Sequence, residues 1–187
     1  MSLTVQKQQT VDALLDSASA VFARHGFDRA SIQTIADATG YSKAGLLHHF
    51  PSKQAIFDAA LAQCRVQLQR IFDRVAPVQT QPDKDRYAVK LLVDLALDRP
   101  GLVALLLTGT TPLGADNGKP EFVAITADLF RAFDVAEGSS NTTRYLQVLG
   151  ALSVLSVLSL NAHELDHTTA WRDDIVRISL AALGYPA

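Results

Sequence analysis

The sequence is poor in cysteine, since Cys64 is the single cysteine among 187 residues. One thiol cannot form an intramolecular disulfide, so the chain is not a disulfide-stapled scaffold and suits a reducing compartment. A signal peptide is also missing, because residues 1–10 are polar. The most apolar run, residues 145–160, is interrupted by Gln147 and three serines and is shorter than the roughly 20 residues that span a bilayer. These absences predict a soluble cytoplasmic protein.

A strong excess of charge of either sign is lacking as well. The formal net charge is -2, which excludes a polybasic nucleic-acid coat, and the hydrophobic share of 48% is that of a globular chain. Strand-like alternation bounded by hairpin turns is absent, whereas apolar residues recur at helical spacing between breaks at glycine and proline. The fold class we expect is therefore all-α.

The breaks divide the chain into helices of ordinary length. The first helix is expected to end at Gly26, which would act as a left-handed cap. Later helices are expected at residues 32–38, 43–50, 52–74, 83–98, 100–108, 121–136, 141–162 and 168–183. Residues 109–120 are rich in Gly, Pro, Asp and Asn and predict the longest loop, of a size that is usually functional or mobile.

Residues 31–50 predict a helix-turn-helix, that is, two short helices joined by a tight turn at Gly40. Ser31 and Ser42 are suited to be the N-caps of the two helices. The second helix has small residues near its start, so it can enter a major groove about 12 Å wide. No acidic residue lies between Asp37 and Asp58, so the basic groups of this stretch cluster where DNA phosphates would lie.

Three segments resemble the N-terminal domain of TetR-family repressors in their order and spacing. They are residues 22–27 (FARHGF), 31–40 (SIQTIADATG) and 42–53 (SKAGLLHHFPSK). The resemblance covers about residues 10–60. It implies three N-terminal helices, a connecting helix at 52–74, a homodimer, and a C-terminal domain with a ligand pocket.

This resemblance assigns residues 1–51 to a DNA-binding helix-turn-helix domain and residues 52–187 to a ligand-binding and dimerisation domain. It also assigns DNA contacts residue by residue, to Ser31, Tyr41, Ser42, Lys43, Ala44, Gly45, Leu47, His48, His49 and Lys53. Lys53 matches a phosphate-facing lysine of the family. Leu47 departs from the family, where tyrosine usually donates a hydroxyl to phosphate, and can instead touch a thymine methyl group or pack.

A competing motif, His163-Glu-Leu-Asp-His167, fits the H-E-x-x-H pattern of zinc proteases. On a helix, His163 and His167 could share a metal, and Glu164 would be the general base. No His or Glu follows as a third ligand, and the motif lies at an expected helix end, so we expect a structural role and no metal or other cofactor.

The C-terminal helices carry two further sets of candidates. Small and apolar residues on these helices either pack inside one subunit or, as the family resemblance favours, form a dimer interface made of Gly150, Ser153, Ser156, Ser159, Trp171, Ile175, Ile178 and Ala182. Aromatic residues that either line a ligand cavity or fill the core are Tyr87, Phe122, Phe130, Phe133 and Tyr145. Cys64 lies on an apolar stripe and is expected to be an inert, buried thiol.

The leading interpretation is a non-enzymatic transcriptional regulator that leaves a pseudo-palindromic operator when a small, largely apolar ligand binds. Two alternatives stay open. One is a zinc-dependent hydrolase built on residues 163–167, and the other is a regulator controlled by a protein partner.

Overall fold

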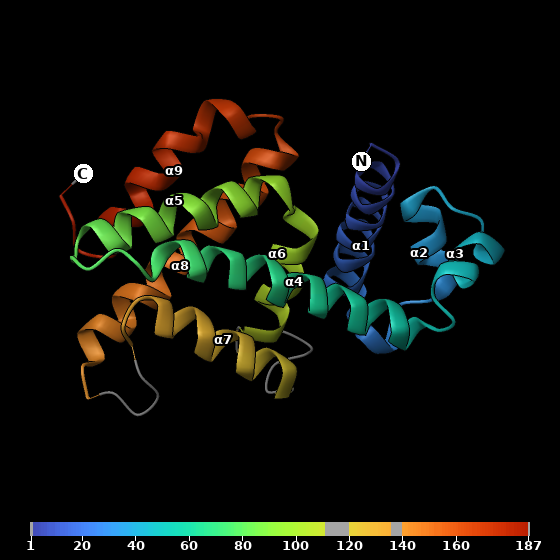
Figure 1. Ribbon diagram of the computed structural model, residues 1–187, viewed down its shortest axis with the longest axis horizontal. Coiled ribbons are helices and arrows are strands. Elements are labelled where there is room, and N and C mark those ends of the chain that lie inside the picture. The colour runs from blue at the N-terminus through green and yellow to red at the C-terminus, as the bar shows by residue number, and fades with distance from the viewer. Residues whose placement is uncertain (1, 111–119, 136–139, 187) are drawn as a thin grey trace. The chain divides into compact units, whose positions relative to one another are not determined.

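The computed structural model describes residues 2–110, 120–135 and 140–186, with side chains from Gln9 onward except that of Thr110. Within this part of the chain there are nine α-helices and no strand, which confirms the all-α fold class (Figure 1). The helices are α1 (Ser2–Arg29), α2 (Ile32–Thr39), α3 (Lys43–His49), α4 (Lys53–Val75), α5 (Asp83–Asp98), α6 (Pro100–Thr110), α7 (Pro120–Ala132), α8 (Thr142–Glu164) and α9 (Thr168–Ala182).

The chain forms two compact units. Unit 1 comprises Met1–Arg65 and Gly101–Lys119, and unit 2 comprises Val66–Pro100 and Pro120–Ala187. The chain therefore passes from unit 1 to unit 2 inside α4. This division differs from the expected domain boundary between residues 51 and 52. That boundary marks the end of the DNA-reading segment, whereas the two units are separated by packing.

Helix bounds follow the expected breaks closely, with two differences. The backbone of Gly26 has φ 73° and ψ 158°, so it kinks α1 and the chain continues for one more turn to Arg29. The expected break lies at the right residue, but its geometry is not that of a left-handed cap, whose ψ is near +47°. The helix expected at 121–136 ends earlier, at Ala132, because Asp134 takes a positive φ of 57°. Most of the expected 109–120 loop lies outside the described residues.

Unit 1 has an aromatic core at the junction of α1 and α4. The rings of Phe22 and Phe57 meet edge to face at 5.2 Å, and Phe27 lies 5.0 Å from Phe57. Phe22 is fully buried. Such aromatic pairs add roughly 0.5–1.5 kcal/mol beyond their buried area, so they fix the start of α4 against the end of α1.

The start of α6 is held against α1 within the same unit. The carboxylate of Asp16 accepts hydrogen bonds from the backbone N–H groups of Gly101 (3.2 Å) and Leu102 (2.9 Å). A Cβ atom on Gly101 would lie 1.9 Å from the Asp16 carbonyl oxygen, so only glycine permits this approach. Asp16 thus caps the N-terminus of α6 from another helix.

In unit 2, α8 packs against α9, and both pack against α5. Figure 1 shows α5 and α9 side by side in this unit. Along α8 the buried residues recur at helical spacing on one face, namely Val148, Ala151, Leu155, Ser159 and Ala162. The other residues of this very apolar helix are half-buried or exposed.

A buried polar cluster ties the ends of unit 2 together. Asp85 on α5 has no exposed surface and accepts hydrogen bonds from Arg144 Nη2 at 2.8 and 2.7 Å. The hydroxyl of Tyr185, beyond α9, donates to the same carboxylate at 2.6 Å. Arg144 Nη2 also donates to the Phe133 carbonyl oxygen at 3.1 Å. One buried acid therefore joins α5, the start of α8 and the chain segment after α9.

Candidate DNA-binding site

The local sequence explains how α2 and α3 form and why they stay short. Ser31 Oγ accepts from the Thr34 N–H at 3.0 Å, and Ser42 Oγ accepts from the Gly45 N–H at 3.0 Å, so both serines are N-caps. Gly40 ends α2 with a left-handed φ of 72°. The caps and the glycine turn confirm the predicted helix-turn-helix.

The two helices bury their inner faces and leave the front of α3 in solvent. Ile35 and Ala36 on α2 and Leu46 on α3 have no exposed surface. The front of α3 carries the exposed side chains of Lys43, Ala44, Leu47, His48 and His49. Leu47 is 37% exposed, so this leucine is available to a thymine methyl group rather than enclosed in the core.

Aromatic side chains gather at the C-terminal end of α3. The His48 and His49 rings lie 5.7 Å apart, and the Tyr41 ring meets His49 edge-on at 6.0 Å. Histidines in the last turn suit the negative end of a helix dipole. With Lys43 at the other end, the exposed face of α3 carries basic groups at both ends and no acid along its length.

The predicted DNA contacts are not all equally available. Ser31 is exposed, although its Oγ already contacts the Thr34 hydroxyl at 2.8 Å. Gly45 is half-buried behind the Ser42 cap. Lys53 is half-buried too, and its ammonium group donates to two backbone carbonyls inside unit 1. No local sequence pattern indicates these partners, because Phe27 and Asp28 are 26 and 25 residues away.

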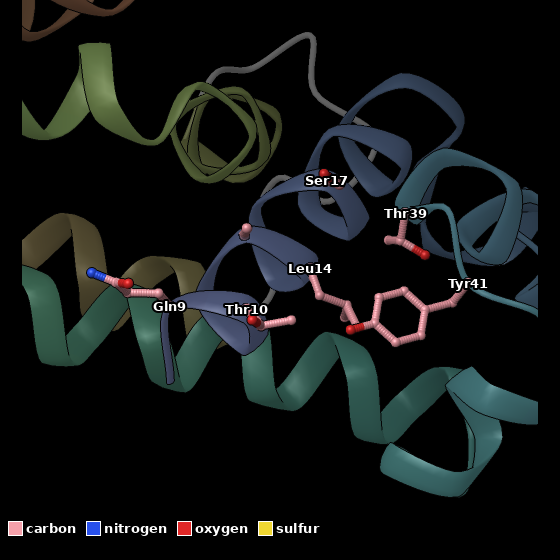
Figure 2. Close-up of a pocket in the computed structure, with 7 residues that line it drawn as sticks. Gln9, Thr10, Leu14, Ser17, Thr39 and Tyr41 are labelled. Atoms are coloured by element: carbon pink, nitrogen blue, oxygen red, sulfur yellow. The ribbon is translucent and has the colours of Figure 1, made fainter. Parts of the chain in front are cut away.

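A groove of about 410 Å³ in unit 1 runs between α1 and the turn from α2 to α3. Figure 2 shows the Tyr41 side chain extending toward α1 beside Leu14. Its lining residues are Gln9, Thr10, Ala13, Leu14, Ser17, Thr39 and Tyr41. None of them is charged, and only Tyr41 was among the predicted site residues.

The five aromatic residues considered for a ligand pocket all belong to unit 2, where they have different surroundings. Phe122, Phe130 and Phe133 are buried, whereas Tyr145 is 45% exposed and stacks on Phe130 at 4.9 Å. The Tyr87 hydroxyl accepts from Arg74 Nη2 at 2.9 Å. Their role in ligand binding stays a prediction.

The zinc-protease motif does not have the helical geometry that it needs. Helix α8 ends at Glu164, and Asp166 has a positive φ of 56°. His163 and His167 therefore do not lie one turn apart on one helix, and His167 instead lies against Trp171, with 5.0 Å between ring centroids. Across residues 2–110, 120–135 and 140–186 no three His, Cys, Asp or Glu side chains form a cluster that could hold a metal ion. The interruption of the helix removes the basis for the hydrolase interpretation.

The predicted dimer residues divide into buried and accessible ones. Ser159 and Ile175 are 0% and 2% exposed within unit 2, so both side chains pack inside their own chain, and their part in a dimer interface stays a prediction. They lie on the faces that α8 and α9 turn toward their own chain. Ile178 is 40% exposed, and Gly150, Ser153, Ser156, Trp171 and Ala182 are half-buried. The outer face of α8 also exposes Leu146, Leu149 and Val157, which the sequence pattern alone did not separate from core positions.

Cys64 is buried, as expected from the apolar stripe on α4. Burial raises the pKa of its thiol to about 12, and the nearby positive charge of Arg65 only partly opposes this. The thiol therefore stays protonated and unreactive at neutral pH.

Comparisons with known proteins bear on the N-terminal part of the chain. Residues 14–60 match the model of the family described as bacterial regulatory proteins, tetR family. This TetR-type segment contains α2 and α3, the two helices of the helix-turn-helix. The chain is 41% identical over 51 residues to the HTH-type transcriptional regulator RutR of Escherichia coli. These 51 residues make up 27% of this chain and 24% of RutR. The match thus spans between 24% and 40% of the length of the curated relatives.

Two solved structures extend the likeness of fold beyond this TetR-type domain. A TetR-family transcriptional regulator from Bordetella parapertussis has a TM-score of 0.60 at 20% identity and covers 95% of this chain and 97% of its own. The regulator FadR from Bacillus subtilis, solved with stearoyl-CoA, has a TM-score of 0.58 at 14% identity and covers 91% and 97%. At these identities the likeness shows that the fold is shared: an N-terminal helix-turn-helix followed by a helical C-terminal domain.

Proposed function

We propose that this protein is a transcriptional repressor that binds operator DNA through α3. The observation that carries the proposal is the capped helix-turn-helix, whose second helix presents Lys43, Ala44, Leu47, His48 and His49 to solvent. A helix of this kind reads base edges in the major groove with its first residues, while nearby basic groups contact phosphates. On this proposal residues 1–51 supply DNA reading, and the protein acts in the cytoplasm, where the DNA is.

The repressor would act as a homodimer through the outer faces of α8 and α9. By length and composition alone, helix α8 is apolar enough to cross a membrane. Only 28% of its most apolar 18-residue stretch is buried within the chain. Exposed Leu146, Leu149 and Val157 form an apolar surface that water disfavours, and a second copy of the chain would cover it. A two-fold dimer would match a pseudo-palindromic operator.

The effector would be a small, largely apolar molecule bound by the C-terminal domain. Support comes from the aromatic residues of unit 2 and from the shared fold with a regulator solved with an acyl-CoA. Binding would shift the population away from the DNA-competent arrangement, provided that the ligand prefers the other arrangement. A coupling of about 1–3 kcal/mol corresponds to an operator affinity lowered about 5–150-fold.

The decisive experiment is selection of duplex DNA from a random pool by the wild-type protein. We expect a pseudo-palindromic sequence to be enriched, and Lys43→Ala to weaken binding to it. Sedimentation should give a dimer at micromolar concentration, and Val157→Arg, which places a charge on the exposed face of α8, should give monomers. If the pool yields no enriched sequence, the chain is not a sequence-specific regulator. A wild-type monomer would contradict the dimer.

Effector binding can be tested separately by a thermal-shift screen with fatty acids and acyl-CoA thioesters, followed by operator competition. We expect a compound that stabilises the protein also to release the operator. A compound that stabilises the protein but leaves operator affinity unchanged at saturation is not an effector. A complete screen without any releasing compound would leave a regulator controlled by a protein partner.

A further inference from the structure

The ammonium group of Lys53, the first residue of α4, is already engaged within unit 1. Its Nζ donates to the carbonyl oxygen of Phe27 at 2.7 Å and to that of Asp28 at 3.1 Å. The same nitrogen lies 4.5 Å from the centroid of the Phe27 ring. Two of its three N–H donors are therefore used, and an aromatic face adds a cation–π contact.

The two carbonyl groups that Lys53 binds belong to the last turn of α1. A helix leaves its final C=O groups without partners inside the helix, and α1 ends at Arg29. Lys53 supplies the missing donors from a different helix and places a positive charge at the negative end of α1. Its side chain is thus a C-cap for α1 that is 25 or 26 residues away in sequence.

A second contact supports the first at the same junction. Phe57 lies one helical turn after Lys53, is 4% exposed, and meets the Phe27 ring at 5.0 Å with an interplanar angle of 63°. Lys53 and Phe57 therefore fix the last turn of α1, the segment that leads into α2, against the first turns of α4. Because α2 and α3 follow directly from this segment, the position of the DNA-reading helix relative to α4 is set here.

We propose that Lys53 is a positioning residue for operator recognition. By tying the end of α1 to α4 it orients α3 for the major groove, and it does not contribute a phosphate contact. This inference rests on the proposed function and replaces the phosphate-facing role that the family resemblance assigns to the same lysine.

The two roles differ in what they do to DNA binding. A phosphate contact acts on every DNA sequence and contributes about 0.9 to the slope of log affinity against log salt. Orientation of α3 matters only for base reading, because phosphate contacts carry no sequence information. Loss of a positioning residue therefore lowers specific affinity while non-specific affinity and the salt slope stay the same. Loss of a residue that only stabilises the fold changes neither affinity, as long as the variant is folded.

The test compares full-length wild type with Lys53→Met, which keeps the aliphatic stem, and with Lys43→Ala and Lys90→Met. Lys90 is an exposed lysine on α5 and serves as the control for loss of one surface charge. Affinities for the selected operator and for a scrambled duplex are measured by fluorescence anisotropy over a series of salt concentrations. The temperature is one at which circular dichroism shows each variant to be folded.

For Lys53→Met we expect a roughly tenfold loss of operator affinity, scrambled-duplex affinity within a factor of about two of wild type, and an unchanged salt slope. Lys43→Ala should lower the slope by about 0.9 if it contacts phosphate, and Lys90→Met should match wild type. A parallel loss on both duplexes with a lower slope would mean that Lys53 contacts phosphate. Unchanged binding by a folded Lys53→Met protein would mean that the cap serves stability alone. Either result overturns the proposal.

Should Lys53→Met fail to fold, Lys53→Arg tests the cap geometry with the charge retained, and the ratio of operator affinity to scrambled-duplex affinity is then the readout. Its guanidinium keeps the charge, but its longer, planar head does not reproduce both carbonyl contacts. Operator affinity that falls with an unchanged slope supports the positioning role, and unchanged operator affinity contradicts it. If wild type itself enriches no sequence, the proposed function fails. If the Lys43 variant behaves as stated and the Lys53 variants do not, the inference alone fails.

Discussion

Arg144 is the charged partner of the buried carboxylate of Asp85, and its removal should strongly destabilise unit 2. Asp85 is 0% exposed and accepts two contacts from Arg144 and one from Tyr185. In Arg144→Met the acid would keep only the tyrosine hydroxyl, and the Phe133 carbonyl would lose its donor as well. Breaking a buried pair in this way costs about 3–5 kcal/mol, because the remaining charge is uncompensated.

A loss of this size is readily measured. At about 2–4 °C per kcal/mol for chains of this length, the midpoint of thermal unfolding should fall by roughly 6–20 °C. Urea denaturation followed by circular dichroism gives the free energy of unfolding directly. The matched control is Arg177→Met, which removes an ion pair with Asp174 whose side chains are 52% and 64% exposed. That change should cost at most about 1 kcal/mol.

The double variant Asp85→Asn/Arg144→Met removes the buried charge together with its partner. It should recover much of the loss, because a neutral amide is far less costly to bury than a carboxylate. If Arg144→Met costs no more than Arg177→Met, or if the double variant is as unstable as the two single changes added together, the buried pair is not what holds the ends of unit 2.

Three further predictions concern the same described contacts. Burial, together with the bond to the Asp85 carboxylate, raises the pKa of Tyr185 to about 12, so the folded state keeps the phenol proton after the unfolded chain loses it near pH 10. The stability that this shift contributes is complete below pH 10 and is lost as pH rises toward 12. In urea titrations across that range the loss should be smaller in Tyr185→Phe than in wild type, and the part that remains includes the Cys64 thiol, whose pKa is also raised. Gly101→Ala should cost at least about 1–3 kcal/mol, since its Cβ would lie 1.9 Å from the Asp16 carbonyl oxygen, and a variant as stable as wild type would refute this close approach. The Cys64 thiol should react with a maleimide only as fast as the protein unfolds, and rapid labelling of the native protein would contradict its burial.

Helix positions were predictable from the sequence because the signals that set them are local. The Ser31 and Ser42 caps and the Gly40 turn gave α2 and α3 within a residue, and α5 matches its expected range of 83–98. The front of α3 followed from helical periodicity. Each of these features depends on contacts between residues at most five apart in sequence, so a local pattern contains the information.

The contacts that hold these helices together were not predictable in the same way. Asp16 is 85 residues from Gly101, and Asp85 is 59 residues from Arg144. Nothing in the spacing of residues pairs them, because the pairs form only once helices have packed. Ser159 shows the same limit, since small residues every three positions on α8 lie partly inside and partly outside, and only packing decides which.

The chain leaves unit 1 through α4 and returns to it at the start of α6, and both helices are anchored to α1 within that unit. Lys53 holds the start of α4 at the end of α1, and Asp16 holds the start of α6 near the middle of α1. If an effector acts on unit 2, as we propose, any displacement along these two connections reaches α1 at both points. A rigid anchor transmits such a displacement, whereas a loosened one absorbs it. Removal of either anchor should therefore weaken the effect of the effector on operator affinity, and linkage requires the effect of operator DNA on effector affinity to weaken by the same factor.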